Sequence, residues 1–452
     1  MTYPPFALTR LTLSMGVLLL AGCNGNDSSP KPEQPTLGHR TVSLIEQDGL
    51  QFKDLDGSGT LTPYEDWRLG AAERARDLVG RLSLAQKAGL MMHGTLVLDA
   101  DGRVNLTAMD KMLREDGVNT FITRMAGDPA AIADDNNRLQ ALLEGVGLGI
   151  PMTVSTDPRN HFTHDPNATS IGAGAFSQWP ETLGLAAIGD AALVQRFGDI
   201  ARQEYRAVGI HEALSPQADL ATEPRWGRIN GTFGEDNLLA KSLVKAYIEG
   251  FQQGSDGIGP ESVVTVVKHF AGAGPQKDGL DAHNPWGKEQ VYPGGQFAYH
   301  LVPFEGAFEA KVGAVMPYYA LPEGLTHEGQ AIEEVGFGFN RQILTDLLRG
   351  HFKFDGVVLS DWGIVNDCDS RCEQGLTQDE VTAGVSPWTV PFGMSWGVEK
   401  LTKAERYAKA IDAGVDQFGG VEDPAPLLAA VQSGLVTEAA ITTSAERILE
   451  QK

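Results

Sequence analysis

Short apolar runs alternate with longer amphipathic stretches along most of the chain, and this alternation constrains the fold more than any other feature. Helical patterns such as 190–209 and 237–252 separate runs that read as strands. Strands separated by helices form parallel sheets. Eight such strands in one domain favour an α/β fold of the TIM type, a (β/α)8 barrel, over an open doubly wound sheet. The predicted strands are 89–96, 118–123, 151–156, 212–216, 263–269, 312–317, 356–360 and 413–418.

A glycine-rich segment supports the same choice of fold. An open dinucleotide-binding sheet requires a glycine-rich phosphate turn directly after its first strand. Here the sequence GVGLGI (145–150) precedes a predicted strand. We therefore interpret it as a turn.

Polar and aromatic residues stand at the carboxyl ends of several predicted strands. In FDGVVLSDWGI (354–364), for example, an apolar run ends in a carboxylate beside a large aromatic ring. The carboxyl ends of all barrel strands lie on one face, where active sites form. We therefore expect four strand ends to meet at one site, contributing Asp157, Lys268 and His269, Tyr318 and Tyr319, and Asp361 and Trp362.

These residue types suit the binding of sugars. Sugar hydroxyls need many hydrogen-bond donors and acceptors, and the C–H faces of a sugar pack on aromatic rings. A carboxylate below the anomeric carbon can also act as a nucleophile and form a glycosyl-enzyme intermediate. None of the four strand ends has the residue spacing of a metal site.

Charge excludes one class of partner. The chain of 452 residues has 36 Lys and Arg against 59 Asp and Glu, a net charge of −23. Binding to a phosphate backbone needs a basic surface. We therefore expect no nucleic-acid partner.

Six ordered segments together resemble glycoside hydrolase family 3, in particular the N-terminal barrel of its β-glucosidase-type members. The resemblance extends from about residue 54 to the C-terminus. The segments are DLVGRLSLAQKAGLM (77–91), PRWGRINGTFGED (224–236), VVKHFAG (266–272), VPFEGAF (302–308), FNRQILTDLLRGHFKFDGVVLSDWG (339–363) and AIDAGVDQ (410–417).

The resemblance implies a role for each residue that matches a family motif. Asp361, in the SDW motif, matches the catalytic nucleophile. The matching substrate-binding residues are Asp157, Arg228, Lys268, His269 and Trp362.

The resemblance also raises a question about the proton donor. The chain stops where the family's barrel meets a linker to a C-terminal α/β sandwich domain, so we expect a single catalytic domain without that sandwich. In most two-domain members the sandwich supplies the acid/base glutamate. Some single-domain members use an Asp-x-His pair instead, and GLDAHNPWG offers Asp281 and His283. An Asp that orients a His can shuttle protons. The alternative is that this loop contacts the aglycone or a missing domain.

The resulting expectation is a retaining, exo-acting, β-glucosidase-like enzyme that forms a covalent intermediate on Asp361. Its substrate would be the terminal non-reducing β-D-glucosyl residues of oligosaccharides, with no cofactor required. Two alternatives remain. One is a β-N-acetylhexosaminidase that uses the Asp–His pair. The other is a non-catalytic sugar-binding lipoprotein, because the second domain is missing or is a separate chain.

The N-terminus predicts export. Arg10 precedes LTLSMGVLLLAGC, an apolar stretch that is short for a membrane span and has small residues before Cys23. We expect residues 1–22 to be a lipoprotein signal peptide, Cys23 to carry lipid, and residues 23–40 to form a flexible tether. Residues 41–452 would form the barrel of a bacterial lipoprotein in the periplasm or on the outer membrane, held to the membrane only by its lipid anchor. An ordinary secretory signal or a short anchor is the alternative.

Two further motifs are independent of the expected site. FKDLDGSGTLTPYEDWR matches a calcium loop with ligand positions at Asp54, Asp56, Ser58, Thr60 and Thr62, and with Glu65 at its twelfth position. A turn that caps the following helix is the alternative to a structural calcium.

The two cysteines that follow Cys23 lie close together in the sequence. Cys368 and Cys372 occur in DCDSRC, and an exported chain meets oxidising conditions. A local disulfide is therefore predicted, with a metal site as the less suitable alternative because no histidine is near.

Overall fold

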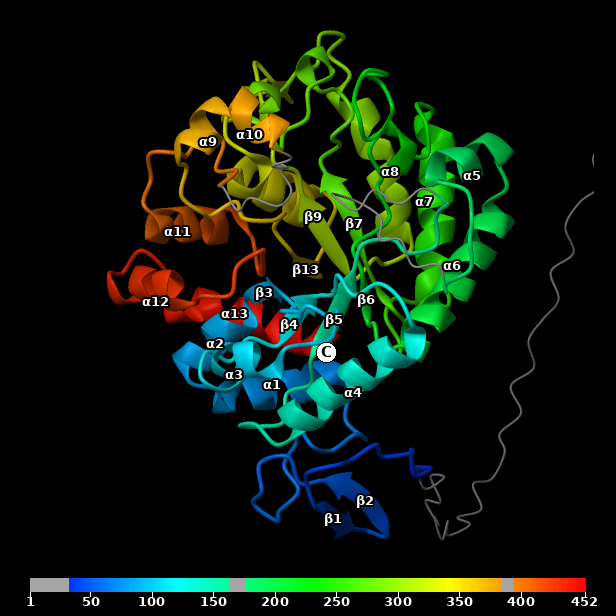
Figure 1. Ribbon diagram of the computed structural model, residues 1–452, viewed down its shortest axis with the longest axis vertical. Coiled ribbons are helices and arrows are strands. Elements are labelled where there is room, and N and C mark those ends of the chain that lie inside the picture. Colours follow the sequence, from blue (N-terminus) through cyan, green and yellow to red (C-terminus); the bar gives the residue numbers. More distant parts are fainter. Residues whose placement is uncertain (1–31, 163–174, 384–392) are drawn as a thin grey trace, which may run out of the picture. The chain divides into compact units, whose positions relative to one another are not determined.

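The centre of the fold is a parallel sheet of eight strands, curled so that the strands at its two ends meet (Figure 1). The computed structural model describes residues 32–162, 175–383 and 393–452. Within it, Leu37–Lys452 form one compact unit, to which the following account refers. In chain order the sheet strands are β3 (Met92–Thr95), β4 (Thr120–Ile122), β5 (Thr153–Thr156), β6 (Glu212–Ala213), β7 (Val264–Phe270), β9 (Ala314–Pro317), β13 (Val357–Val358) and β14 (Phe418–Gly419).

Neighbouring strands in this sheet are also consecutive in the sequence. The order is β13-β9-β7-β6-β5-β4-β3-β14, and all pairings are parallel. A parallel bridge between Leu359 and Gln417 joins the two ends of this order, and Ser360 N donates to Gln417 O at 2.8 Å. The predicted parallel α/β sheet of eight strands is therefore confirmed.

Helices surround the sheet, and one or more follow every strand (Figure 1). Asp190 and Asp236 cap α6 and α7 through their carboxylates, which confirms the two long helices predicted from periodicity. The α-helices are α1 (Ala71–Arg81), α2 (Leu84–Leu90), α3 (Leu106–Arg114), α4 (Pro129–Glu144), α5 (Thr182–Ile188), α6 (Ala191–Ala207), α7 (Asn237–Gln252), α8 (Phe297–Glu309), α9 (Ser370–Gln374), α10 (Gln378–Thr382), α11 (Lys403–Ala413), α12 (Ala425–Gln432) and α13 (Glu438–Gln451).

Shorter elements decorate this framework. A hairpin of β1 and β2 precedes α1, and the segment after β9 forms a π-helical turn, η5 (Gln342–His351). The remaining pieces are β1 (Leu44–Gln47), β2 (Leu50–Lys53), β8 (Glu289–Gln290), β10 (Leu321–Pro322), β11 (Thr326–His327), β12 (Gln330–Ala331), η1 (Ile229–Gly231), η2 (Lys277–Gly279), η3 (Pro285–Gly287) and η4 (Phe337–Phe339).

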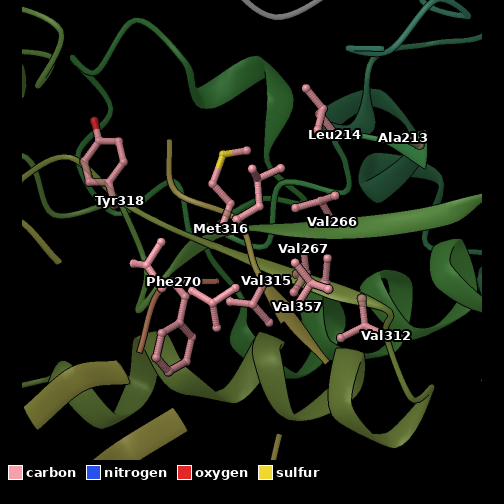
Figure 2. Close-up of a cluster of buried hydrophobic side chains, with 14 of the residues drawn as sticks. Ala213, Leu214, Val266, Val267, Phe270, Val312, Val315, Met316, Tyr318 and Val357 are labelled. Carbon is pink, nitrogen blue, oxygen red and sulfur yellow. The ribbon is translucent and has the colours of Figure 1, made fainter. Parts of the chain in front are cut away.

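Apolar side chains on both faces of the strands hold the sheet in place. All seven residues of β7 are buried, as expected for a parallel strand covered on both sides. Figure 2 shows Val267 and Phe270 of this strand on the same side as Val315 of β9, whereas Val266 lies on the opposite side of the strand, near Met316. Burying such side chains contributes about 1.5–3 kcal/mol each.

Two predicted strand boundaries are wrong. Residues 84–90 form α2, so the strand expected at 89–96 begins only at Met92. The strand expected at 413–418 begins five residues later, at Phe418, and ends at Gly419, because α11 continues to Ala413. In both cases the predicted strand includes residues that end a helix. A short apolar run has no periodicity that would distinguish a strand from the end of a helix.

The predictions for the N-terminus fall mainly outside the described residues. The signal segment 1–22 and Cys23 lie there, as does the tether up to residue 31. Residues 32–39 form no helix or strand and are mostly exposed. Among the described residues, no helix is both long and apolar enough to span a membrane.

Candidate active site

The strand ends bring the predicted site residues together on one face of the sheet. Asp157 directly follows β5, Lys268 and His269 lie near the end of β7, and Asp361 follows β13 with two residues between. All four side chains are at least nine-tenths buried. Since parallel strands end at the same edge, the expected convergence is a direct result of the topology.

Asp361 presents a carboxylate oxygen that the described residues leave without a hydrogen-bond partner. Its Oδ1 accepts a hydrogen bond from Trp362 N at 2.8 Å. Its Oδ2 is buried, has no hydrogen-bond partner among the described residues, and lies 3.9 Å from His269 Nε2. A buried polar atom without a partner is costly and uncommon. It is the arrangement expected where a ligand is to react or bind.

Arg228 lies on the same side of His269. Its Nη2 is 3.3 Å from His269 Nε2, while its Nε and Nη1 are buried without a partner in the described chain. Burial alone would lower the pKa of Arg228, but the charge of Asp281 and those of nearby acidic groups raise it. The guanidinium therefore stays charged and has free donors for a ligand's oxygen atoms.

Asp157 forms an ion-pair cluster with two cations. It accepts from Lys268 Nζ at 3.2 Å and from Arg124 Nη1 at 2.7 Å. Burial would raise the pKa of Asp157, but the two positive charges hold it below its ordinary value. The carboxylate is thus ionised and can only accept hydrogen bonds.

Aromatic rings connect the Asp157 cluster with Asp361. Trp362 packs edge-on against His93 at 5.2 Å between ring centroids. Burial lowers the pKa of His93 to about 3, and the charge of Asp157 partly opposes this shift. Trp362 Nε1 is buried without a partner among the described residues. Gly420, at a φ of +71°, lies against this ring, where a Cβ would approach Trp362 to 2.6 Å.

Tyr319 provides another wall of the site. Burial raises its pKa well above 10, and the charge of Asp361 raises it further. The neutral hydroxyl therefore lies close to the candidate nucleophile. On its other side, Tyr319 packs against His283 at 4.7 Å between ring centroids.

Asp281 and His283 form the predicted pair. Asp281 Oδ1 makes a close hydrogen bond with His283 Nδ1, and its Oδ2 accepts from Trp226 Nε1 at 2.7 Å. Burial would raise the pKa of Asp281, but His283 and Arg228 hold it far below its ordinary value. Through Tyr319 and Arg228, the pair belongs to the same site as Asp361.

Two residues of the site were not predicted, Arg124 after β4 and Asp219 in the loop after β6. Tyr319 was expected at the site as a strand-end aromatic. Asp219 pairs with His269, which lies 50 residues later in the sequence, and Arg124 pairs with Asp157, which lies 33 residues later. No short-range spacing in the sequence indicates such pairs.

The predicted calcium loop lies apart from this site, next to the β1–β2 hairpin. Asp54, Asp56 and Glu65 each place a carboxylate oxygen within 4.8 Å of the others. Calcium ligands at 2.3–2.6 Å are compatible with that separation. Ser58 Oγ donates to Thr60 O at 3.1 Å, so these two predicted ligands bond to each other.

A disulfide joins Cys368 and Cys372, as predicted from their spacing. It lies at the start of α9, in the segment that follows the Asp361 strand. Cys372 is fully buried. The bond therefore ties the chain before α9 to the third residue of that helix.

The fold and site define an α/β protein with a curled parallel sheet and a polar, aromatic-walled site at the carboxyl ends of its strands. The family model described as glycosyl hydrolase family 3 N-terminal domain matches residues 103–451. The chain belongs to this family.

Relatives agree with this assignment. The chain is 55% identical over 426 residues to the periplasmic β-glucosidase/β-xylosidase of Dickeya chrysanthemi, covering 93% of this chain and 64% of that protein. It is 44% identical over 386 residues to β-glucosidase C of Emericella nidulans, covering 84% and 58%. The chain thus spans about three fifths of the length of these relatives.

Solved structures share the fold. The β-glucosidase EmGH1 of Erythrobacter marinus matches with a TM-score of 0.66 at 23% identity, over 86% of this chain and 46% of that one. A family 3 β-N-acetylglucosaminidase of Paenibacillus matches with a TM-score of 0.61 at 24% identity, over 82% and 62%. At these identities the likeness shows the fold alone.

Proposed function

We propose that the protein is a retaining, exo-acting β-glycosidase that removes terminal non-reducing β-D-glucosyl residues from oligosaccharides. The observation that carries the proposal is the unpartnered Asp361 Oδ2, buried beside His269 and the free donors of Arg228. The names of the two relatives above, a β-glucosidase/β-xylosidase and a β-glucosidase, support this substrate class.

In this proposal Asp361 attacks the anomeric carbon and a covalent glycosyl-enzyme intermediate forms. Trp362 N holds Oδ1, so the attacking oxygen is Oδ2, which has no hydrogen-bond partner in the described part of the chain. Water later releases the sugar with retention at the anomeric carbon.

The remaining residues hold the sugar. The charged pair of Asp157 and Lys268 offers an acceptor and donors for adjacent hydroxyls, and Arg228 offers two free donors. Trp362 packs against a face of the ring. Interactions that strengthen as the anomeric carbon becomes positive would raise kcat rather than only lower KM.

The Asp281–His283 pair is the candidate proton donor that the described chain offers. It favours a second function, that of a β-N-acetylhexosaminidase, in which His283 carries the proton. In both functions the leaving oxygen must be protonated, so hydrolysis depends on whichever group supplies that proton.

Hydrolysis of four nitrophenyl glycosides tests the proposal: β-glucoside, β-xyloside, β-N-acetylglucosaminide and α-glucoside. We expect kcat/KM to be largest for the β-glucoside and negligible for the α-glucoside. A preference for the N-acetylglucosaminide that is lost in His283→Gln would favour the second function. Binding of glucose without hydrolysis of any of the four substrates would favour the alternative of a non-catalytic sugar-binding lipoprotein.

Export and lipid attachment at Cys23 are part of the proposal. The Dickeya relative is named periplasmic, which supports export. Mass analysis of the N-terminal peptide, prepared from membranes, would show whether Cys23 carries lipid.

We also propose a structural calcium at the Asp54 loop. Calcium at 1 mM is expected to raise the thermal unfolding temperature relative to EDTA, because ion binding to the folded state alone stabilises it. The response should disappear in Glu65→Gln, which loses a ligand charge. Equal unfolding temperatures with calcium and with EDTA would contradict the site and favour the capping turn.

A further inference from the structure

Asp219 is a buried acidic residue that contacts the site but has no role in the chemistry above. It lies in the loop after β6 and its side chain is fully buried. Oδ2 lies 2.7 Å from His269 Nδ1. Oδ1 accepts from the backbone N–H groups of His269 at 3.0 Å and Ala273 at 2.7 Å.

These contacts define the proton positions on His269. Burial would raise the pKa of Asp219, but His269 and the two backbone donors keep it below its ordinary value, so the carboxylate is an acceptor only. His269 Nδ1 must therefore carry a proton. Burial lowers the pKa of His269 below its ordinary value. The carboxylates of Asp219 and Asp361 oppose this shift and Arg228 adds to it, so the net direction is downward and the ring is neutral near pH 7.

A neutral ring with its proton on Nδ1 has a lone pair on Nε2. That atom faces Arg228 Nη2 at 3.3 Å and Asp361 Oδ2 at 3.9 Å. Arg228 is a donor only, so the bare Nε2 is compatible with it, whereas an Nε2–H would face another N–H.

We propose that Asp219 is a positioning residue that fixes His269 in the tautomer whose Nε2 accepts a hydrogen bond in the site. The inference rests on the proposed glycosidase function. A sugar hydroxyl that replaces the Arg228 Nη2 contact can then donate to His269 Nε2 and accept from an N–H of Arg228 at the same time. This pairing orients the hydroxyl beside the Asp361 oxygen that attacks.

Replacement of Asp219 by Asn separates this role from a structural one. The two backbone N–H groups hold one side-chain oxygen, so the Asn amide must place its oxygen there and its NH2 towards His269 Nδ1. The loop contacts are thereby kept, but Nδ1 can no longer donate. The ring proton must move to Nε2, which then faces the donors of Arg228.

Spectra of protein labelled with 15N-histidine report the tautomer directly. In the wild type we expect a protonated Nδ1 and an unprotonated Nε2 for His269, assigned by its absence in His269→Gln. In Asp219→Asn we expect the two nitrogens to exchange these states. An imidazolium or an Nε2–H tautomer in the wild type would overturn the inference, whatever any variant does.

Kinetics test the consequence. We expect Asp219→Asn to lower kcat/KM for the β-glucoside by about 10- to 100-fold, because a donor replaces an acceptor at one sugar hydroxyl. The unfolding temperature should stay near that of the wild type. Added to His269→Gln, the substitution should cause little further loss, since both remove the same contact.

Two kinds of failure are distinguishable. If the wild type hydrolyses no β-glycoside, the proposed function fails, and glucose binding by the wild type and Asp219→Asn then tests the inference alone, with weaker binding expected for the variant. If the wild type is active but Asp219→Asn keeps both its activity and its tautomer, the inference fails. A loss of activity that is additive with His269→Gln would likewise point to a structural role.

Discussion

Replacement of Asp361 by Asn is expected to lower kcat for β-glucoside hydrolysis by about 10⁴-fold or more, because the amide cannot attack the anomeric carbon. The thermal unfolding temperature should stay near that of the wild type. Oδ1 can keep its hydrogen bond from Trp362 N, and the other oxygen has no partner among the described residues to lose. Single-turnover kinetics and thermal unfolding of the purified variant measure the two effects.

Asp412→Asn is the matched control for this substitution. Asp412 lies in α11, and its side chain is 70% exposed, with Arg341 3.3 Å away. Such surface ion pairs contribute about 0–1 kcal/mol, so activity and stability should both stay near those of the wild type. An Asp361→Asn protein with more than a tenth of the wild-type kcat would contradict the assignment of the nucleophile.

The second large effect is expected from Asp157→Asn, which should lower kcat/KM by about 10²- to 10³-fold. The amide loses the charged acceptor for sugar hydroxyls, and a site built to pair such groups is sensitive to their removal. The substitution also leaves Lys268, which is 6% exposed, without its counter-charge. Breaking a buried pair in this way costs about 3–5 kcal/mol, which urea unfolding would show.

The double variant Asp157→Asn with Lys268→Met distinguishes stability from binding. Removal of both charges should restore much of the stability, because the uncompensated cation is gone. It should not restore kcat/KM, because the hydroxyl-binding pair is still missing. Recovery of activity together with stability would show that Asp157 only keeps the site folded.

The sheet was predictable because its strands are buried on both faces. The run VTVVKHF of β7 has the β-branched, apolar composition of such a strand, and its observed bounds differ from the predicted 263–269 by one residue at each end. The strand near 413–418 was misplaced for a physical reason. Asp416 in that segment is buried in ion pairs with Arg349 and Arg447, a tertiary arrangement with no local pattern.

The site likewise contains some residues that the sequence predicts and others that it does not. The rule that barrel strands end at one face was enough to bring together Asp157, His269 and Asp361. It could not find Asp219, which lies in a loop and bonds to a residue 50 positions later. Nor could it show that Asp281 and His283 lie beside the walls of the site, because this depends on Tyr319, which follows β9, and on Arg228, which precedes η1.

The central claim is that Asp361 forms the glycosyl-enzyme bond. Its most direct test is peptide mass spectrometry of the protein after inactivation by a 2-deoxy-2-fluoro-β-glucosyl fluoride, which traps such an intermediate. We predict one fluorosugar per chain, attached to Asp361 in the segment 354–364. An adduct on another carboxylate, or steady hydrolysis of β-glucosides with no adduct at all, would contradict the account.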